Sequence, residues 1–151
     1  MTGNGDGDRA AQPPRVVVGV DGSESSRAAL RWAVRHAGLI GGAVEAVGVI
    51  EVPQDFGWNA PVVDTSFDED MTRRRFGAEL RTVLGETPTV AVQELLVRGD
   101  PVDALVEAAR GAELVVVGSR GHGRVARALL GSVSQQVAQQ ASCPVVIVRP
   151  D

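Results

Sequence analysis

The chain has 151 residues, of which 44% are hydrophobic, 23% charged and 3% aromatic, and its formal net charge is −4. The length fits one domain that can bury a core, and the composition is ordinary for a soluble globular protein. Nucleic-acid binding is disfavoured because it relies on aromatic stacking platforms and a basic surface. We expect no membrane segment, since no apolar run approaches the roughly 20 residues that cross a bilayer. The N-terminus lacks the apolar core of a signal peptide, which favours a cytoplasmic protein.

The order of apolar runs predicts strands that alternate with helices. Residues 1–14 are rich in Gly, Asp and Pro and are expected to form a disordered tail, which leaves 15–150 as one domain. Short apolar runs are typical of strands buried on both faces, at 15–20, 43–50, 90–97, 113–117 and 144–148. Apolar residues at helical spacing predict helices at about 25–39, 66–85, 101–110 and 132–140. Ser23 and Asp100 are suited to cap the first and third of these helices.

This alternation predicts an α/β fold, a three-layer α/β/α sandwich with a five-stranded parallel sheet and right-handed crossovers. Ligands of such sheets bind at the carboxyl ends of the strands, where the strand order reverses. Two loops at such ends carry unusual chemistry: Asp21-Gly22-Ser23 after the first strand, and the glycine-rich 118–134 after the fourth. If both loops serve one ligand, these two strands are neighbours, which gives the strand order 3-2-1-4-5.

The stretch 118–134 has the layout of a phosphate-binding loop, which lies between a strand and a helix N-terminus. Three glycines that permit a tight turn and a close backbone approach precede three residues whose N–H groups are free at the start of a helix. In chain order they are Gly118, Gly121, Gly123, Ser132, Val133 and Ser134. The stretch contains neither the Gly-Lys-Ser/Thr of a Walker loop nor a Gly-x-Gly-x-x-Gly fingerprint. A di- or triphosphate site and a purely structural glycine turn both fit.

Polar side chains near these loops each have two interpretations. Asp21 is suited to bond a ribose hydroxyl or help hold a metal ion, or else to form an Asx-turn. Arg120 and Arg124 would neutralise phosphate charge or be solvated, and His122 has no apparent partner nucleophile or acid. The single cysteine, Cys143, is interpreted as a small buried side chain. We expect no metal site built from protein alone, because no His, Cys or carboxylate cluster has ligand spacing.

Several motifs together resemble the universal stress protein family over about 15–150. VVVGVDGSESSRAALRWA at 16–33 resembles its opening strand and helix, and ELVVVGSRGHG at 113–123 resembles its fourth strand and loop. The pattern Gly118-x2-Gly121-x9-Gly131-Ser132 is similar to the nucleotide-binding signature of its ATP-binding branch. CPVVIVRP at 143–150 resembles its last strand, whereas Gly19 departs from the Pro that the family often carries there.

The resemblance implies a Rossmann-like fold, similar to the adenine nucleotide alpha hydrolases, in the same strand order. It implies bound ATP, with or without Mg²⁺, and no strong catalytic cycle. The residues near adenosine would be Gly19, Val20, Asp21 and Val49. The residues around the phosphates would be Gly118, Arg120, Gly121, Gly123, Gly131, Ser132, Val133 and Ser134. It also implies a homodimer, often formed through the final strand, here Val145–Val148, and an exposed apolar edge strand favours such pairing.

The resulting hypothesis is a nucleotide-dependent regulatory module of a stress response that acts on an unidentified protein partner. Two alternatives stay open. One is a slow ATPase or phosphotransferase, although no general base or Walker lysine is visible in the sequence. The other is a nucleotide-free dimerisation module whose glycines are purely structural.

Overall fold

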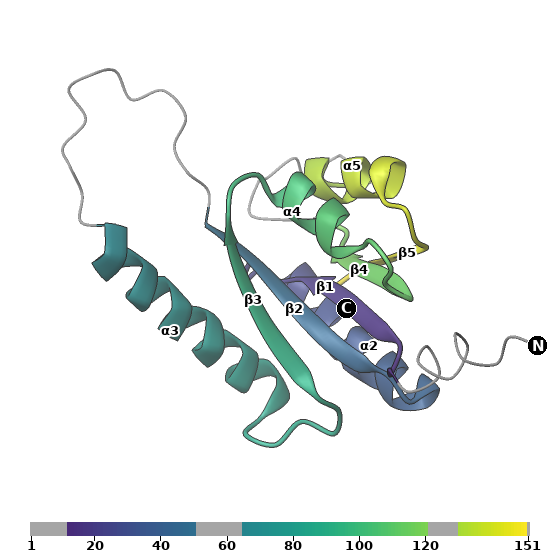
Figure 1. Cartoon of the computed structure of the whole chain (residues 1–151), viewed down its shortest axis with the longest axis horizontal. Coiled ribbons are helices and arrows are strands. Elements are labelled where there is room, and N and C mark those ends of the chain that lie inside the picture. The colour runs from purple at the N-terminus through teal and green to yellow at the C-terminus, as the bar shows by residue number, and fades with distance from the viewer. Residues whose placement is uncertain (1–11, 51–64, 121–129, 151) are drawn as a thin grey trace, which may run out of the picture.

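The computed structural model describes residues 12–50, 65–120 and 130–150, without side-chain detail at 65–68. The described strands form one parallel sheet in the order β3-β2-β1-β4-β5 (Figure 1). They are β1 Arg15–Gly19, β2 Ala43–Ile50, β3 Val92–Arg98, β4 Leu114–Gly118 and β5 Val145–Val148. The helices are α2 Glu24–Ile40, α3 Thr65–Leu84, α4 Pro101–Ala108 and α5 Ser132–Gln140. The predicted α/β class and strand order are confirmed.

Two helices cover each face of the sheet, as Figure 1 shows for α4 and α5. Val16 and Val18 of β1 belong to the apolar cluster under α2 and α3, whereas Val17 belongs to the cluster under α4 and α5. Successive strand residues point to opposite faces, and all three of these valines are fully buried. The sheet is therefore covered on both sides, which explains why its strands are continuous apolar runs.

Side-chain caps begin two of the helices where the sequence predicts them. The Oγ of Ser23 accepts a hydrogen bond from the backbone N–H of Ser26 at 3.2 Å, at the start of α2. A carboxylate oxygen of Asp100 accepts one from the N–H of Asp103 at 3.1 Å, at the start of α4. Each cap satisfies a donor that the helix itself leaves unpaired.

The predicted third strand is displaced by one to two residues, since β3 is Val92–Arg98 and not 90–97. Its bounds follow from its partner: β2 pairs with it from Val44–Val92 to Ile50–Arg98. Apolar pattern alone could not fix these ends, because a strand ends where its neighbour stops offering hydrogen bonds. Of the tail predicted at 1–14, residues 1–11 lie outside the described residues, and so do residues 51–64 of the stretch 51–65, which the sequence predicts to be a long loop.

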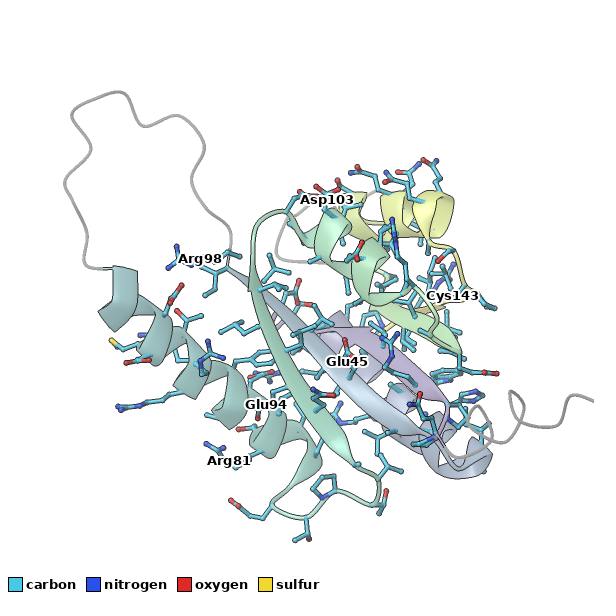
Figure 2. All side chains as sticks on the ribbon, viewed as in Figure 1. Glu45, Arg81, Glu94, Arg98, Asp103 and Cys143 are labelled. Carbon is cyan, nitrogen blue, oxygen red and sulfur yellow. The ribbon has the colours of Figure 1, made fainter. Side chains whose placement is uncertain are left out.

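Helix α3 contacts the sheet through an aromatic ring and an ion pair, and it contacts α2 through a second ion pair. The ring of Phe76 lies so close to Gly48 of β2 that a Cβ there would be 2.6 Å from its Cε2 atom. Glu69 pairs with Arg98 at the carboxyl end of β3, where Figure 2 shows Arg98. Glu79 pairs with Arg27 of α2. These contacts place α3 and α2 on the same face of the sheet.

Candidate functional site

The two loops of unusual chemistry leave neighbouring strands at the carboxyl edge of the sheet. β1 pairs with β4 up to Val18–Val116, so Gly19 and Gly118 end adjacent strands. Gly118 also lies against the first turn of α2, where a Cβ on it would be 2.6 Å from the carbonyl carbon of Ser25. No larger residue fits this approach without movement of backbone. The loops therefore meet at the point where the strand order reverses, which is where ligands of such sheets bind.

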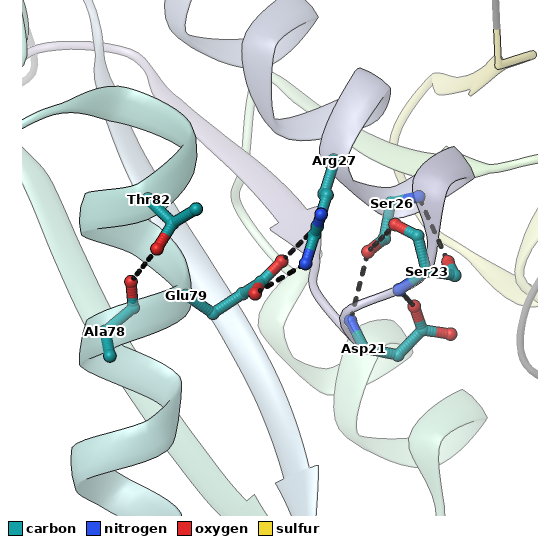
Figure 3. Close-up of polar contacts among 7 residues, drawn as sticks. All are labelled: Asp21, Ser23, Ser26, Arg27, Ala78, Glu79 and Thr82. Atoms are coloured by element: carbon teal, nitrogen blue, oxygen red, sulfur yellow. Dashed lines mark hydrogen bonds and ion pairs between the residues drawn. The ribbon is translucent and has the colours of Figure 1, made fainter.

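Asp21 forms a tight turn into α2 (Figure 3). Its Oδ1 atom accepts a hydrogen bond from the N–H of Ser23 at 2.9 Å, which is an Asx-turn. Its own N–H donates to the Oγ of Ser26 at 3.3 Å. Gly22 between them has φ of 83°, a conformation that glycine adopts without strain. The turn leaves the Asp21 side chain exposed at the carboxyl edge, with one oxygen engaged by Ser23.

A cluster of buried serines joins this turn to the loop after β4. The Oγ atoms of Ser25 and Ser119 lie 3.2 Å apart, and the Ser25 Oγ also accepts a hydrogen bond from the N–H of Arg120 at 3.1 Å. The Ser119 carbonyl accepts bonds from the N–H of Gly131 at 2.7 Å and the hydroxyl of Ser134 at 3.4 Å. Ser119 and Gly131 are thus bonded to each other, and Ser119 and Arg120 are bonded to Ser25 of α2.

The N-terminus of α5 presents donors toward the same edge. Gly131 is its N-cap and supplies no side-chain cap, so the first N–H groups of the helix have no such partner. The Ser132 hydroxyl is exposed and accepts a hydrogen bond from the side chain of Gln136 at 3.1 Å. Ser134 is buried, and its hydroxyl donates to the carbonyl of Gly131 at 3.0 Å. An anion here would meet the N–H groups of Ser132, Val133 and Ser134. Of the two serine hydroxyls, that of Ser132 would be available to it, and that of Ser134 would not.

The remaining predicted residues differ in what they could contribute. Val20 is buried and donates its N–H to the carbonyl of Val47 at 2.8 Å, so it offers a ligand only backbone. Gly19 allows the close approach of Leu105, whose Cδ1 would lie 3.1 Å from a Cβ there. Val49 lies near the carboxyl end of β2, partly buried against the apolar cluster of α4 and α5. Gly121, His122, Gly123 and Arg124 lie outside the described residues.

Charge near the site is partly neutralised within the protein. Glu79 accepts hydrogen bonds from Nε and Nη2 of Arg27 at 2.6 and 3.1 Å, and it raises the pKa of that guanidinium by the hydrogen bond and by its charge (Figure 3). Arg120 is exposed, while its backbone N–H is bonded to Ser25.

Within residues 12–50, 69–120 and 130–150, no group of three or more His, Cys, Asp or Glu side chains could hold a metal. No helix of the described residues is long and apolar enough to span a bilayer.

A model of the universal stress protein family matches residues 14–149. The chain belongs to the universal stress protein family. A universal stress protein of Mycolicibacterium smegmatis is 37% identical over 142 residues, which cover 90% of this chain and 48% of that protein. This universal stress protein thus spans about half the length of the curated relatives it matches.

Two solved structures of the family share the fold. UspA from Lactobacillus plantarum is 23% identical, with a TM-score of 0.68 over 92% of this chain and 99% of that one. A universal stress protein solved in complex with cAMP is 29% identical, with a TM-score of 0.63 over 93% of this chain and 100% of that one.

Two site residues of this universal stress protein were missed from the sequence. Ser25 and Ser119 are 3% exposed and hydrogen-bonded across 94 positions of the chain. Helical spacing does predict that Ser25 faces the sheet, because Ala29 and Ala33 lie on the same face. A small polar residue on a helix face that is otherwise apolar was the feature of the sequence that could have indicated Ser25 as a site residue.

Proposed function

We propose that this universal stress protein binds ATP at the carboxyl edge between β1 and β4, and acts as a nucleotide-dependent regulatory module of a stress response with little or no turnover. The observation that carries the proposal is the open N-terminus of α5, whose N–H groups have no side-chain cap, beside the exposed Asp21 turn. A helix N-terminus favours the negative charge of phosphates. A carboxylate nearby is suited to accept hydrogen bonds from ribose hydroxyls.

The relative solved with cAMP supports an adenine nucleotide at this site, since it is 29% identical over nearly the whole chain. Among the adenine nucleotides, we propose ATP as the ligand. It rests on the resemblance of the spacing Gly118-x2-Gly121-x9-Gly131-Ser132 to the nucleotide-binding signature of the ATP-binding branch of the family, and the uncapped N-terminus of α5 supports it. Mg²⁺ would bind through the phosphates and the exposed carboxylate of Asp21, because magnesium sites commonly combine one or two carboxylates with substrate phosphates.

The proposal of little or no turnover is supported by the described side chains around the α5 N-terminus. They are serines engaged with other protein groups, and none is a Lys or a general base aimed at the site. Phosphoryl transfer needs a cation and a positioned base or water in addition to backbone donors. We therefore propose that occupancy, and not hydrolysis, carries the signal to a cytoplasmic protein partner.

A homodimer is the second part of the proposal. Of the two edge strands in the described sheet, β3 carries the exposed Gln93, Glu94 and Arg98, whereas β5 is Val-Val-Ile-Val, half-buried throughout. Charged side chains discourage pairing at an edge, and their absence permits it. We propose that Val145–Val148 of two copies pair with each other.

The nucleotide proposal is tested by mass spectrometry of the ligand released from denatured native protein, together with thermal-shift titrations of ATP, ADP, AMP and cAMP. ATP at 100 times its Kd should stabilise the fold by about 2.7 kcal/mol. Asp21→Asn removes the negative charge and keeps an oxygen that can accept the hydrogen bond from the Ser23 N–H. Asp21→Ala removes both the charge and that acceptor, so comparing the two variants separates the effect of the charge from that of the turn. Absence of any nucleotide and of any shift would refute the proposal, and ATP consumption abolished by Ser132→Ala would favour an enzyme.

A further inference from the structure

Four serines account for the buried polar side chains in the part of the chain with described side chains: Ser25, Ser26, Ser119 and Ser134, each 3% or 4% exposed. All four lie at the junction of α2, β4 and α5. Each makes a hydrogen bond there, and no buried side-chain donor or acceptor in the described residues lacks a partner. Burying a hydroxyl is unfavourable unless it is bonded, so such a group is retained where its bonds fix a geometry.

Ser25 is the member whose bonds cross between the two halves of the candidate site. Its Oγ accepts from the N–H of Arg120 at 3.1 Å and lies 3.2 Å from the Oγ of Ser119. Both partners belong to the chain directly after β4, 94 and 95 positions away. The first turn of α2, which carries the Asp21 turn at its start, is therefore bonded directly to the start of the glycine-rich stretch.

The connection continues into α5 through the main chain of Ser119. Its carbonyl accepts the N–H of Gly131, the N-cap of α5, at 2.7 Å. Its N–H donates to the carbonyl of Val148 at 2.8 Å, which ties the same residue to β5. A shift of Ser119 would therefore carry the N-cap of α5 with it, and with that the N–H groups proposed to bind phosphate.

We infer that Ser25 is a positioning residue of the nucleotide site: through Ser119 and Arg120 it fixes the separation between the Asp21 turn and the N-terminus of α5. The inference rests on the proposed function. Ser25 does not contact the ligand itself, because its hydroxyl is buried and engaged by protein groups. Its role is to keep both groups of donors and acceptors in register before the ligand arrives, which lowers the ordering cost of binding.

Ser25→Ala removes the acceptor of the Arg120 N–H and the hydroxyl partner of Ser119 in one change. Loss of such a pairing should weaken nucleotide binding about tenfold, mainly through faster dissociation. Val44→Ala is the matched control. Val44 is 1% exposed at the amino end of β2, so its truncation lowers stability without touching the carboxyl edge.

The experiment combines two measurements on the full-length wild type and both variants: Kd by calorimetric titration with the nucleotide that the wild type binds, and amide hydrogen exchange without nucleotide. In Ser25→Ala we expect a raised Kd and faster exchange at Arg120 and Gly131. In Val44→Ala we expect an unchanged Kd and faster exchange only in β2 and its neighbours. If Ser25→Ala does not fold, Ser119→Ala takes its place, since it leaves the bond from Arg120 to Ser25 intact and should raise Kd by a smaller factor.

Three results would overturn the inference. A wild-type Kd in Ser25→Ala would do so while leaving the proposed function in place. An equal rise of Kd in Val44→Ala would reduce the effect to general stability. A wild type that binds no adenine nucleotide would refute the proposed function and the positioning role together, and the hydrogen-exchange result would then report only a structural bond.

Discussion

Gly118 at the end of β4 lies against the backbone of Ser25 in α2, so that a Cβ on Gly118 would be 2.6 Å from the Ser25 carbonyl carbon and 2.8 Å from its oxygen. Both atoms are backbone and cannot rotate away. The contact joins the two loops that frame the candidate nucleotide site. It explains why the strand must end in glycine here, independently of any ligand.

Gly118→Ala should therefore separate α2 from β4 and cost about 1–3 kcal/mol of stability, the usual cost of overpacking. It should also abolish the nucleotide-induced thermal shift, because the Asp21 turn and the N-terminus of α5 would move apart. Gly38→Ala is the control. Its Cβ would lie 3.7 Å from Val90 in ordinary contact, and within a helix it should stabilise by about 0.5–1 kcal/mol. Urea unfolding of both variants checks this, and a Gly118→Ala protein as stable as wild type would contradict it.

The ion pair of Arg27 with Glu79 should contribute to docking of α3 on α2. Glu79→Gln removes the charge while keeping most of the shape, so its melting temperature should fall below that of the wild type in low salt. The difference should shrink in 1 M NaCl, where the screening length is about 3 Å. Differential scanning calorimetry at both salt concentrations measures this.

Glu107→Gln is the control for that ion pair. Glu107 forms an ion pair with Arg110, and the side chains of Arg110 and Glu107 are 72% and 73% exposed. Ion pairs this exposed contribute little to stability. Glu107→Gln should melt with the wild type at every salt concentration. Equal shifts in the two variants would contradict the assignment of a docking role to the Arg27 pair.

The proposed dimer makes a prediction about the backbone of β5. The N–H of Val115 donates to the carbonyl of Pro144, and the N–H of Ser119 donates to the carbonyl of Val148. Since backbone groups of successive strand residues point in opposite directions, those of Val145 and Ile147 point away from β4. Ile147→Pro should remove an outward N–H, leave the internal ladder intact and yield monomers. Ile147→Ala keeps that N–H and should stay dimeric. Sedimentation velocity distinguishes them, and an Ile147→Pro protein that remains dimeric would exclude pairing through β5.

Cys143, just before β5, is partly buried, and this burial raises the pKa of its thiol, with the positive charge of Arg15 opposing the shift (Figure 2). A raised pKa means that the folded state favours the protonated thiol. The stability from this group is present below the pKa of the unfolded chain and is lost as the pH rises through the folded pKa. Alkylation by iodoacetamide should therefore be slower in native than in denaturant-unfolded protein, with a rate midpoint at higher pH. Cys143→Ser supplies the background, and a native midpoint at or below the unfolded one would contradict the shift.

The sequence by itself determined the elements and their order. Continuous apolar runs such as the one at 16–18 predicted strands buried on both faces, and Ser23 and Asp100 predicted where two helices begin. These features are local, because strand alternation and helix capping act over a few residues. The strand order also followed, since two chemically unusual loops were assumed to share one edge, and the pairing of β1 with β4 confirms it.

Only the tertiary structure decided how the site residues are used. Asp21 forms an Asx-turn, which confirms its structural interpretation, and its side chain is exposed at the carboxyl edge, whereas its role toward a ligand stays a prediction. The hydroxyl of Ser134 donates to the carbonyl of Gly131, and the hydroxyl of Ser25 accepts a hydrogen bond from the N–H of Arg120. These bonds join positions up to 95 residues apart, and no local pattern encodes which hydroxyl a buried N–H will find. That choice depends on the close approach of Gly118 to α2, which exists only once the sheet has assembled.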